Sequence, residues 1–118
     1  MVLHSRGHRV HKGFDTVLEE ALAQANEGPE CLYISVDIDV LYLVFAPGIC
    51  TPEPDGLTTA DLLRAVRRVS LTGSLMDIGV VEVSSPYYGP AGLVLEVAHR
   101  VVLETISALA WFRFRPQL

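Results

Sequence analysis

Apolar and polar positions along the chain predict helices that alternate with strands. An apolar stripe with helical spacing follows Asp15. Similar stripes predict a second helix over about residues 60–70 and a third over about residues 91–112. Runs of β-favouring residues at 32–38 and 75–83 predict two strands.

Capping and helix-breaking residues indicate where the first two helices begin and end. Thr16 and Glu19 have the spacing of a capping box, and the Gly-Pro pair at 28–29 is expected to end the first helix. Thr58 or Thr59 is expected to cap the second helix, because a hydroxyl there can accept a hydrogen bond from a free backbone N–H.

This order of elements is typical of βαβ units, so we predict an α/β fold in which helices flank a parallel sheet. The strands are apolar runs, as expected where both faces of a sheet are covered. A further short strand is expected near residues 8–12. Residues 1–118 are expected to form a single domain, with a frayed tail at 113–118.

The composition indicates a globular domain whose surface is covered in part by the rest of a larger domain or by another subunit. Half of the 118 residues are hydrophobic and 19% are charged, as in ordinary globular proteins. The mean hydropathy of +0.35 is high for so short a chain. We therefore expect one sheet edge and one sheet face to be uncovered, so that the chain forms a homo-oligomer or requires a complementing polypeptide.

Charge and cysteine content argue against several kinds of partner and location. The net charge of −5 disfavours binding to nucleic acid or to an anionic membrane. Cys31 and Cys50 fit no zinc-binding spacing, so a reducing, cytoplasmic compartment is expected. The sequence shows no signal-peptide pattern and no uncharged apolar run long enough to span a bilayer.

Two aspartates at the end of the first predicted strand are the strongest candidate for chemistry. Asp37 and Asp39 are separated by one residue, so in an extended strand both side chains would point to the same side. Two adjacent carboxylates are costly to bury unless a cation neutralises them, and their oxygens suit a divalent metal ion. The alternative is a pair that is simply solvated or that caps the following turn.

Glu82 lies close to the end of the second predicted strand. Ligands of parallel sheets bind beyond the carboxyl ends of the strands, where this residue and the aspartate pair both occur. A carboxylate can accept two parallel hydrogen bonds from a guanidinium group. The alternative is an exposed or salt-bridged glutamate, which is the commoner role of such a residue.

The remaining polar features are less specific. Residues 40–57 form a long loop rich in proline and glycine, and prolines lower the entropy that an ordered, functional loop must lose. The four histidines show no metal-ligand spacing, and solvation or packing is expected for each. These are His4, His8, His11 and His99.

Three segments of the chain resemble the ureohydrolases, the family of arginases, agmatinases and related enzymes that act on guanidino compounds, with the agmatinase type nearest. The segments are SVDIDV at 35–40, FAPGICTPEPDGL at 45–57 and GVVEVSSPY at 79–87. The resemblance covers only the C-terminal part of the family's domain, less than half of it. It implies a part of a three-layer α/β/α fold of arginase type.

The resemblance also implies an activity and a set of site residues. A family member hydrolyses a small guanidino substrate such as agmatine to urea and an amine, using hydroxide that two manganese ions generate from water. By this resemblance, Asp37 and Asp39 bind manganese, one of them bridging both ions. Glu82 holds the guanidinium group, and Thr51 lines the pocket.

The sequence departs from the family pattern in ways that keep other functions open. The family's remaining metal ligands, a histidine and an Asp-x-His-x-Asp motif, are absent from this sequence. Tyr42-Leu43 replaces a usual Asp-Pro, and Gly79 replaces a usual aspartate, with Asp77 displaced by two positions. A non-catalytic remnant that acts as an assembly or binding module is the main alternative. A magnesium enzyme acting on a phosphorylated substrate is disfavoured, because no glycine-rich phosphate loop occurs.

Overall fold

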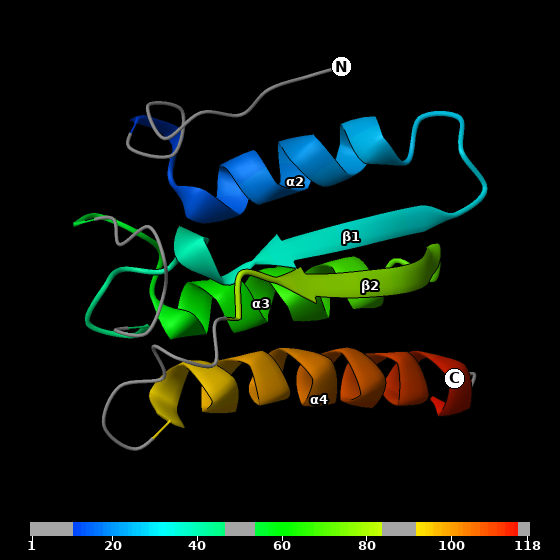
Figure 1. The fold of residues 1–118 in the computed structure, drawn as a ribbon. Coiled ribbons are helices and arrows are strands. Elements are labelled where there is room, and N and C mark those ends of the chain that lie inside the picture. Colours follow the sequence, from blue (N-terminus) through cyan, green and yellow to red (C-terminus); the bar gives the residue numbers. More distant parts are fainter. Residues whose placement is uncertain (1–10, 47–53, 84–91, 116–118) are drawn as a thin grey trace.

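The computed structural model describes residues 11–46, 54–83 and 92–115. Helices and strands alternate along the chain, as predicted, and Figure 1 shows their arrangement. The elements are α2 (Phe14–Ala25), β1 (Leu32–Asp37), the short 3-10 helix η1 (Ile38–Val40), α3 (Thr59–Ser70), β2 (Leu75–Val81) and α4 (Leu93–Phe114). The helix α4 therefore continues two residues beyond its expected end.

The strands β1 and β2 pair in parallel, which confirms the predicted α/β class. Leu32 pairs with Leu75 and Tyr33 pairs with Asp77, so Met76 is an extra residue in β2. Such a bulge absorbs an insertion without changing which side chains face the core further along the strand. The further strand expected near residues 8–12 is wrong at positions 11 and 12, which are helical, while 8–10 lie outside the described residues.

Within the described residues, the helices cover one face of the sheet and leave the other uncovered. Alternate strand residues, among them Ile34, Val36 and Val80, pack into the core that α3 and α4 complete. On the opposite face, Tyr33 is 64% exposed and Asp37 is also exposed. In Figure 1, α3 lies behind the two strands, with α2 along β1 and α4 along β2. The expectation of an uncovered sheet face is thus confirmed for the described residues.

The core places fully buried side chains close to the carboxyl end of β1. Ile38, the first residue of η1, and Leu41, which follows its last residue, are fully buried. Val66 of α3 and Val101 of α4 are fully buried as well. Burying an aliphatic side chain of this size contributes roughly 1.5–3 kcal/mol. The chain after β1 is therefore held by burial of its apolar residues and by an isolated parallel bridge between Leu41 and Leu57.

The structure confirms the predicted cap of α3 and contradicts the predicted cap of α2. Thr58 forms a capping box with Asp61, since its hydroxyl accepts the Asp61 N–H at 3.1 Å and Asp61 accepts the Thr58 N–H in return. The helix α2 instead begins after Gly13 and has no side-chain cap, so Thr16 lies inside the helix. Glu19 pairs with Arg68 of α3, with a shortest distance of 2.6 Å. The capping spacing at 16–19 is therefore coincidental.

These two threonines provide a matched test of capping. Thr58→Ala is expected to lower the free energy of unfolding by about 1 kcal/mol, because it leaves a helix-terminal N–H without its acceptor. Thr16→Ala is expected to change it by less than about 0.5 kcal/mol, because Thr16 is exposed within α2 and alanine favours helices. Urea denaturation of both variants measures the difference, and equal losses would contradict the assignment.

Candidate functional site

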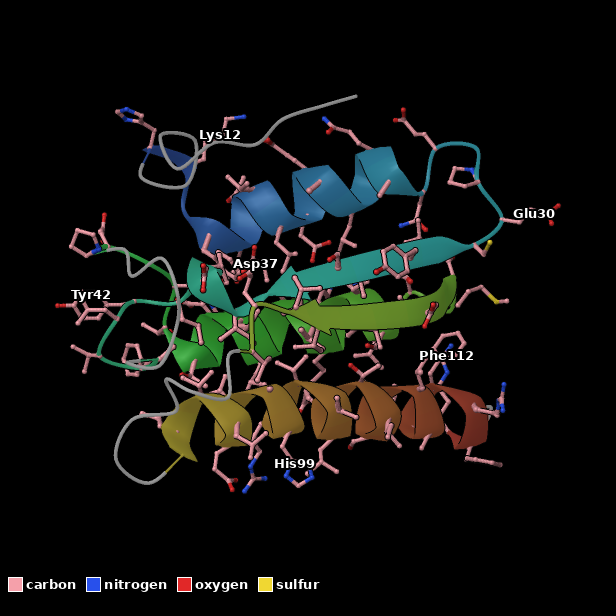
Figure 2. The ribbon with its side chains drawn as sticks, in the orientation of Figure 1. Lys12, Glu30, Asp37, Tyr42, His99 and Phe112 are labelled. Carbon is pink, nitrogen blue, oxygen red and sulfur yellow. The ribbon has the colours of Figure 1, made fainter. Side chains whose placement is uncertain are left out.

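The carboxyl ends of β1 and β2 bring the predicted acidic residues to one edge of the structure. Asp37 is the last residue of β1 and pairs with Val81, the last residue of β2. Glu82 follows directly after that pair, and Asp39 lies in η1, which begins where β1 ends. Figure 2 shows Asp37 at this end of the strand. Three carboxylate residues from two neighbouring strand ends therefore gather here, as the parallel topology requires.

Asp37 shapes the turn that carries the second aspartate. Its Oδ1 accepts a hydrogen bond of 2.9 Å from the backbone N–H of Asp39 and so caps η1. Asp39 does not continue the extended strand, which ends at Asp37, so strand alternation does not determine the direction of its side chain. The chain turns here because Ile38 is drawn into the core and the Asp37 side chain satisfies the turn's free N–H.

Asp39 carries the clearest sign of a binding site. Its Oδ1 is buried and has no hydrogen-bond partner within the described part of the chain. An unsatisfied buried acceptor costs about 1–3 kcal/mol, and more when it carries charge. A bound cation would remove that cost, because metal coordination satisfies a buried carboxylate oxygen. This feature fits the residue to the metal-binding role that the sequence predicted.

The arginines of α3 pair with carboxylates other than Asp37 and Asp39. Arg64 of α3 binds Asp15 at 3.0 Å and Asp61 at 2.8 Å. Arg67 binds Glu104 of α4 at 2.7 Å. No ion pair in the described ranges involves Asp37 or Asp39, so no side-chain cation substitutes for a metal ion.

The aspartates supply only part of a metal centre. Among residues 11–46, 54–83 and 92–115, no three histidine, cysteine, aspartate or glutamate side chains are placed to hold one ion. Manganese and magnesium sites in proteins are near-octahedral and take several oxygen donors. Further ligands must therefore come from residues outside this described set if the centre is to be complete.

Glu82 has a backbone conformation that is unusual for its residue type. Its φ is 61°, in the left-handed region that residues other than glycine and asparagine rarely adopt. The residue is exposed, so its carboxylate is open to a ligand. Such a conformation costs about 1–3 kcal/mol and is often found at binding sites. Thr51, the other residue predicted to bind substrate, lies outside the described residues.

The strain at Glu82 can be separated from its chemistry by two substitutions. Glu82→Gly is expected to raise the free energy of unfolding by about 0.5–1 kcal/mol relative to Glu82→Ala, because glycine adopts positive φ at little cost. Both variants remove the carboxylate, so a difference between them reports the backbone conformation and not the charge. Chemical denaturation measures this difference. An alanine variant as stable as the glycine variant would show that the left-handed conformation is not retained.

A backbone clamp closes the base of the loop after the aspartates, and the sequence analysis missed its central residue. Tyr42 donates its N–H to the Leu57 carbonyl at 2.9 Å, and Leu57 donates its N–H to the Val40 carbonyl at 2.8 Å. Gly56 lies so close that an added Cβ would collide with the backbone of Leu41 and Tyr42. The Asp-Gly dipeptide at 55–56, a turn signal, could have identified it. The clamp fixes the chain within two residues of Asp39.

Gly79, which stands where an aspartate is usual, lies close to the side chain of Tyr33. The Tyr33 ring lies over Gly79 on the bare sheet face, and a Cβ added to Gly79 would meet the Tyr33 hydroxyl. Asp77 accepts the N–H of Ile78 at 2.8 Å and so is occupied locally.

The chain is similar to proteins of one enzyme family. The family model described as the arginase family matches residues 4–107. Guanidinopropionase from Pseudomonas aeruginosa is 36% identical over 104 residues, which are 86% of this chain and 30% of that protein. Agmatinase from Chromobacterium violaceum is 39% identical over 77 residues, which are 64% of this chain and 22% of that protein.

Solved structures show the same arrangement of elements. The crystal structure of formimidoylglutamase from Bacillus subtilis superposes with a TM-score of 0.83 at 28% sequence identity, covering 90% of this chain and 33% of that chain. This likeness confirms the expected fold, which is a part of the arginase type. The chain spans about a third or less of the length of these three relatives. No helix in the described ranges is long and apolar enough to cross a membrane.

Proposed function

This chain belongs to the arginase family, and we propose that it supplies part of a metal-dependent centre that hydrolyses a guanidino compound to urea and an amine. The observation that carries the proposal is the buried Oδ1 of Asp39, which has no partner in the described residues. It lies two residues from Asp37, at the strand ends where ligands of parallel sheets bind. A purely structural aspartate in this position would be expected to accept a hydrogen bond from the protein.

The proposed cations are two manganese ions. Asp39 would bind through the unpaired Oδ1, and Asp37 would bind through the carboxylate oxygen that does not cap η1. Carboxylate oxygens are hard donors that suit manganese. When bound, these ions would supply a nucleophile from water at neutral pH. The resonance-stabilised carbon of a guanidinium group needs such a nucleophile.

Glu82 is proposed to hold the guanidinium group. Its carboxylate is exposed at the end of β2, beside the strand that delivers Asp37. Two parallel hydrogen bonds from a guanidinium to this carboxylate would fix the orientation of the substrate carbon relative to the aspartates. Agmatine is the substrate we propose, and Thr51 is proposed to line the pocket. The relatives named for guanidinopropionate and agmatine support the guanidino class.

A second candidate function rests on the incomplete set of ligands. Within the described residues no group of three metal-binding side chains occurs. A non-catalytic remnant that acts as an assembly or binding module would need no such group. Manganese binding distinguishes the two candidate functions, because only the hydrolytic one requires manganese to bind at Asp37 and Asp39.

Urea release in the presence of manganese tests the proposal. The chain is assayed with agmatine, guanidinobutyrate and guanidinopropionate, alone and together with the part of P. aeruginosa guanidinopropionase that lies outside the match to this chain. We expect urea from at least one guanidine in the mixture, and none when Asp39→Asn replaces the native chain. Absence of both urea release and manganese binding under all these conditions would exclude the catalytic function.

A further inference from the structure

We infer that Arg64 is a positioning residue that couples helix α2 to the loop base beside Asp39. Its guanidinium group joins two helices, because Nε binds Asp15 Oδ1 of α2 at 3.0 Å and Nη2 donates to Asp61 Oδ1 of α3 at 2.8 Å. The same group lies over the ring of Phe14, 5.5 Å from its centroid. A guanidinium group can hold several partners at once, because its N–H donors form a rigid fork. Arg64 therefore ties the start of α2 to the first turn of α3.

Asp61 carries this link to the capping box of α3. Its Oδ2 accepts the Thr58 hydroxyl at 2.7 Å and the Thr58 N–H at 3.4 Å, while its Oδ1 is held by Arg64. One carboxylate thus binds the cap residue and the arginine at the same time. Hydrogen bonds to both oxygens restrict the rotation of the carboxylate, and bonds in such a network strengthen one another. Loss of the arginine would therefore weaken the cap.

The cap residue is joined directly to the clamp at the base of the loop. Leu57 precedes Thr58, and it forms the two clamp hydrogen bonds, with Val40 at 2.8 Å and with Tyr42 at 2.9 Å. Val40 follows Asp39 directly, so the clamp fixes the chain one residue from the buried Oδ1 of Asp39. In Figure 1, α2 and α3 both begin at the end of the structure where β1 ends. A contiguous series of contacts therefore leads from α2 to the candidate metal ligand.

Arg68 is a matched comparison, because it links the same two helices from the other end of α3. It binds Glu19 of α2 through two hydrogen bonds, of 2.6 Å and 2.8 Å. Arg68 lies in the last turn of α3, whereas Asp61 and the cap lie at its start. The two arginine side chains are similarly exposed, 51% for Arg64 and 45% for Arg68. Loss of Arg68 should therefore loosen α2 without disturbing the cap.

Hydrogen–deuterium exchange of the whole chain without metal tests the coupling. The amides of Leu57 and Tyr42 report opening of the clamp, since each donates one of its hydrogen bonds. We expect Arg64→Met to accelerate their exchange about threefold, a modest change because exposed ion pairs are weak. Arg68→Met is expected to change it by less than about 1.5-fold. Added salt should accelerate exchange of these amides in the native chain and not in Arg64→Met, because salt screens the ion pairs.

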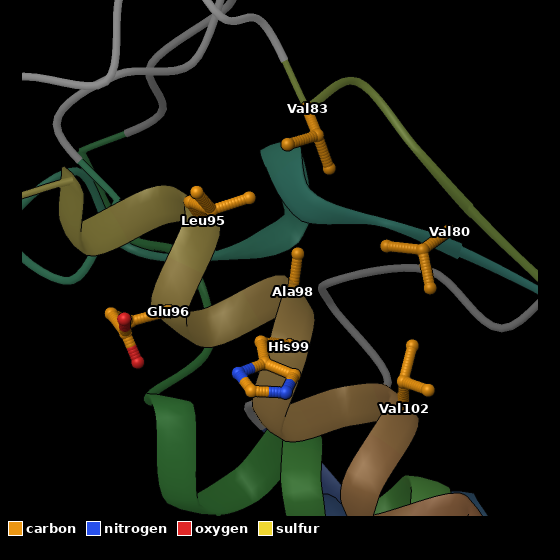
Figure 3. A pocket seen from close by; sticks show the side chains of 7 residues that line it. All are labelled: Val80, Val83, Leu95, Glu96, Ala98, His99 and Val102. Atoms are coloured by element: carbon orange, nitrogen blue, oxygen red, sulfur yellow. The ribbon is translucent and has the colours of Figure 1, made fainter.

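Two further variants separate the coupling from a general loss of stability. Arg64→Lys keeps the charge but lacks the fork that holds two carboxylates, so its clamp amides should exchange more slowly than those of Arg64→Met and faster than the native ones. Val102→Ala removes packing in the pocket of about 440 Å³ between β2 and α4, which Figure 3 shows. We expect it to lower the free energy of unfolding and to leave exchange of the clamp amides unchanged. Urea denaturation measures the overall stability of each variant.

The coupling rests on the proposed function only in its consequence for manganese. Saturating manganese should slow exchange of the clamp amides in the native chain, because metal bound at Asp39 favours the closed clamp. Clamp exchange that is unchanged in Arg64→Met, equally fast in Arg68→Met or independent of salt would overturn the coupling, as would manganese that binds without slowing these amides. A chain that binds no manganese would instead overturn the proposed metal site, and exchange without metal would still decide the coupling.

Discussion

Replacing Asp39 with alanine is expected to abolish manganese binding and yet to leave the metal-free chain as stable as before, or more stable by about 1 kcal/mol. The physical reason is the buried Oδ1, which has no partner in the described residues and so destabilises the metal-free fold. Removing it relieves that cost. Titration with manganese, followed by electron paramagnetic resonance, measures binding, and urea denaturation without metal measures stability.

Asp37→Ala is the matched control for this result. Asp37 also contributes to the proposed metal site, so manganese binding should again be lost. Its Oδ1, however, caps η1 by accepting the Asp39 N–H at 2.9 Å. Losing a cap of this kind costs about 1 kcal/mol. The two variants should therefore agree in metal binding and differ in stability, and a comparable loss of stability in both would show that Asp39 has a structural partner.

Gly56→Ala is expected to lower the free energy of unfolding by about 3 kcal/mol or more. A Cβ at this position would collide with the Leu41 carbonyl carbon and the Tyr42 amide nitrogen, which are backbone atoms and cannot move aside. The change would open the clamp that joins Leu57 to Val40 and Tyr42. Since the clamp lies beside Asp39, manganese binding should weaken as well. Thermal denaturation and manganese titration measure the two effects.

Gly79→Ala is the control for the clamp. A Cβ there would also meet a close neighbour, but that neighbour is the hydroxyl of Tyr33, a side chain that is 64% exposed and can rotate into solvent. We expect a loss below about 1 kcal/mol. If both glycine variants lost the same stability, general crowding rather than the loop clamp would explain the result.

Local patterns predicted those parts of the fold that depend on a few neighbouring residues. The apolar stripe that predicted a helix over residues 60–70 supplies Leu62, Val66 and Val69 to the core, because a helix with apolar residues along one face buries that face. Thr58 could be recognised as a cap because its partner is only three residues away. The same rule failed at Thr16, where the chain enters the helix from Gly13 and no cap is formed.

At the candidate site, the sequence pattern predicted only part of the backbone structure. The run of β-favouring residues predicted a strand over 32–38, which ends one residue earlier, at Asp37. The extended geometry assumed for Asp39 is not found, because the chain turns into η1 after Asp37. That turn depends on burial of Ile38 in a core built from residues of α3 and α4, which are distant in sequence. Spacing alone could not predict this contact.

By itself, the amino-acid sequence determined the α/β class, the parallel pairing and the presence of acidic residues at the carboxyl ends of both strands, because apolar periodicity and strand order act through neighbouring residues. Only the tertiary structure decided that Asp39 has a buried oxygen without a partner, that Glu82 adopts a left-handed conformation and that Gly56 clamps the loop. The contact of Gly56 with Leu41 and Tyr42 joins segments that are separated in the chain, and contacts of that kind leave no periodic signal in the sequence.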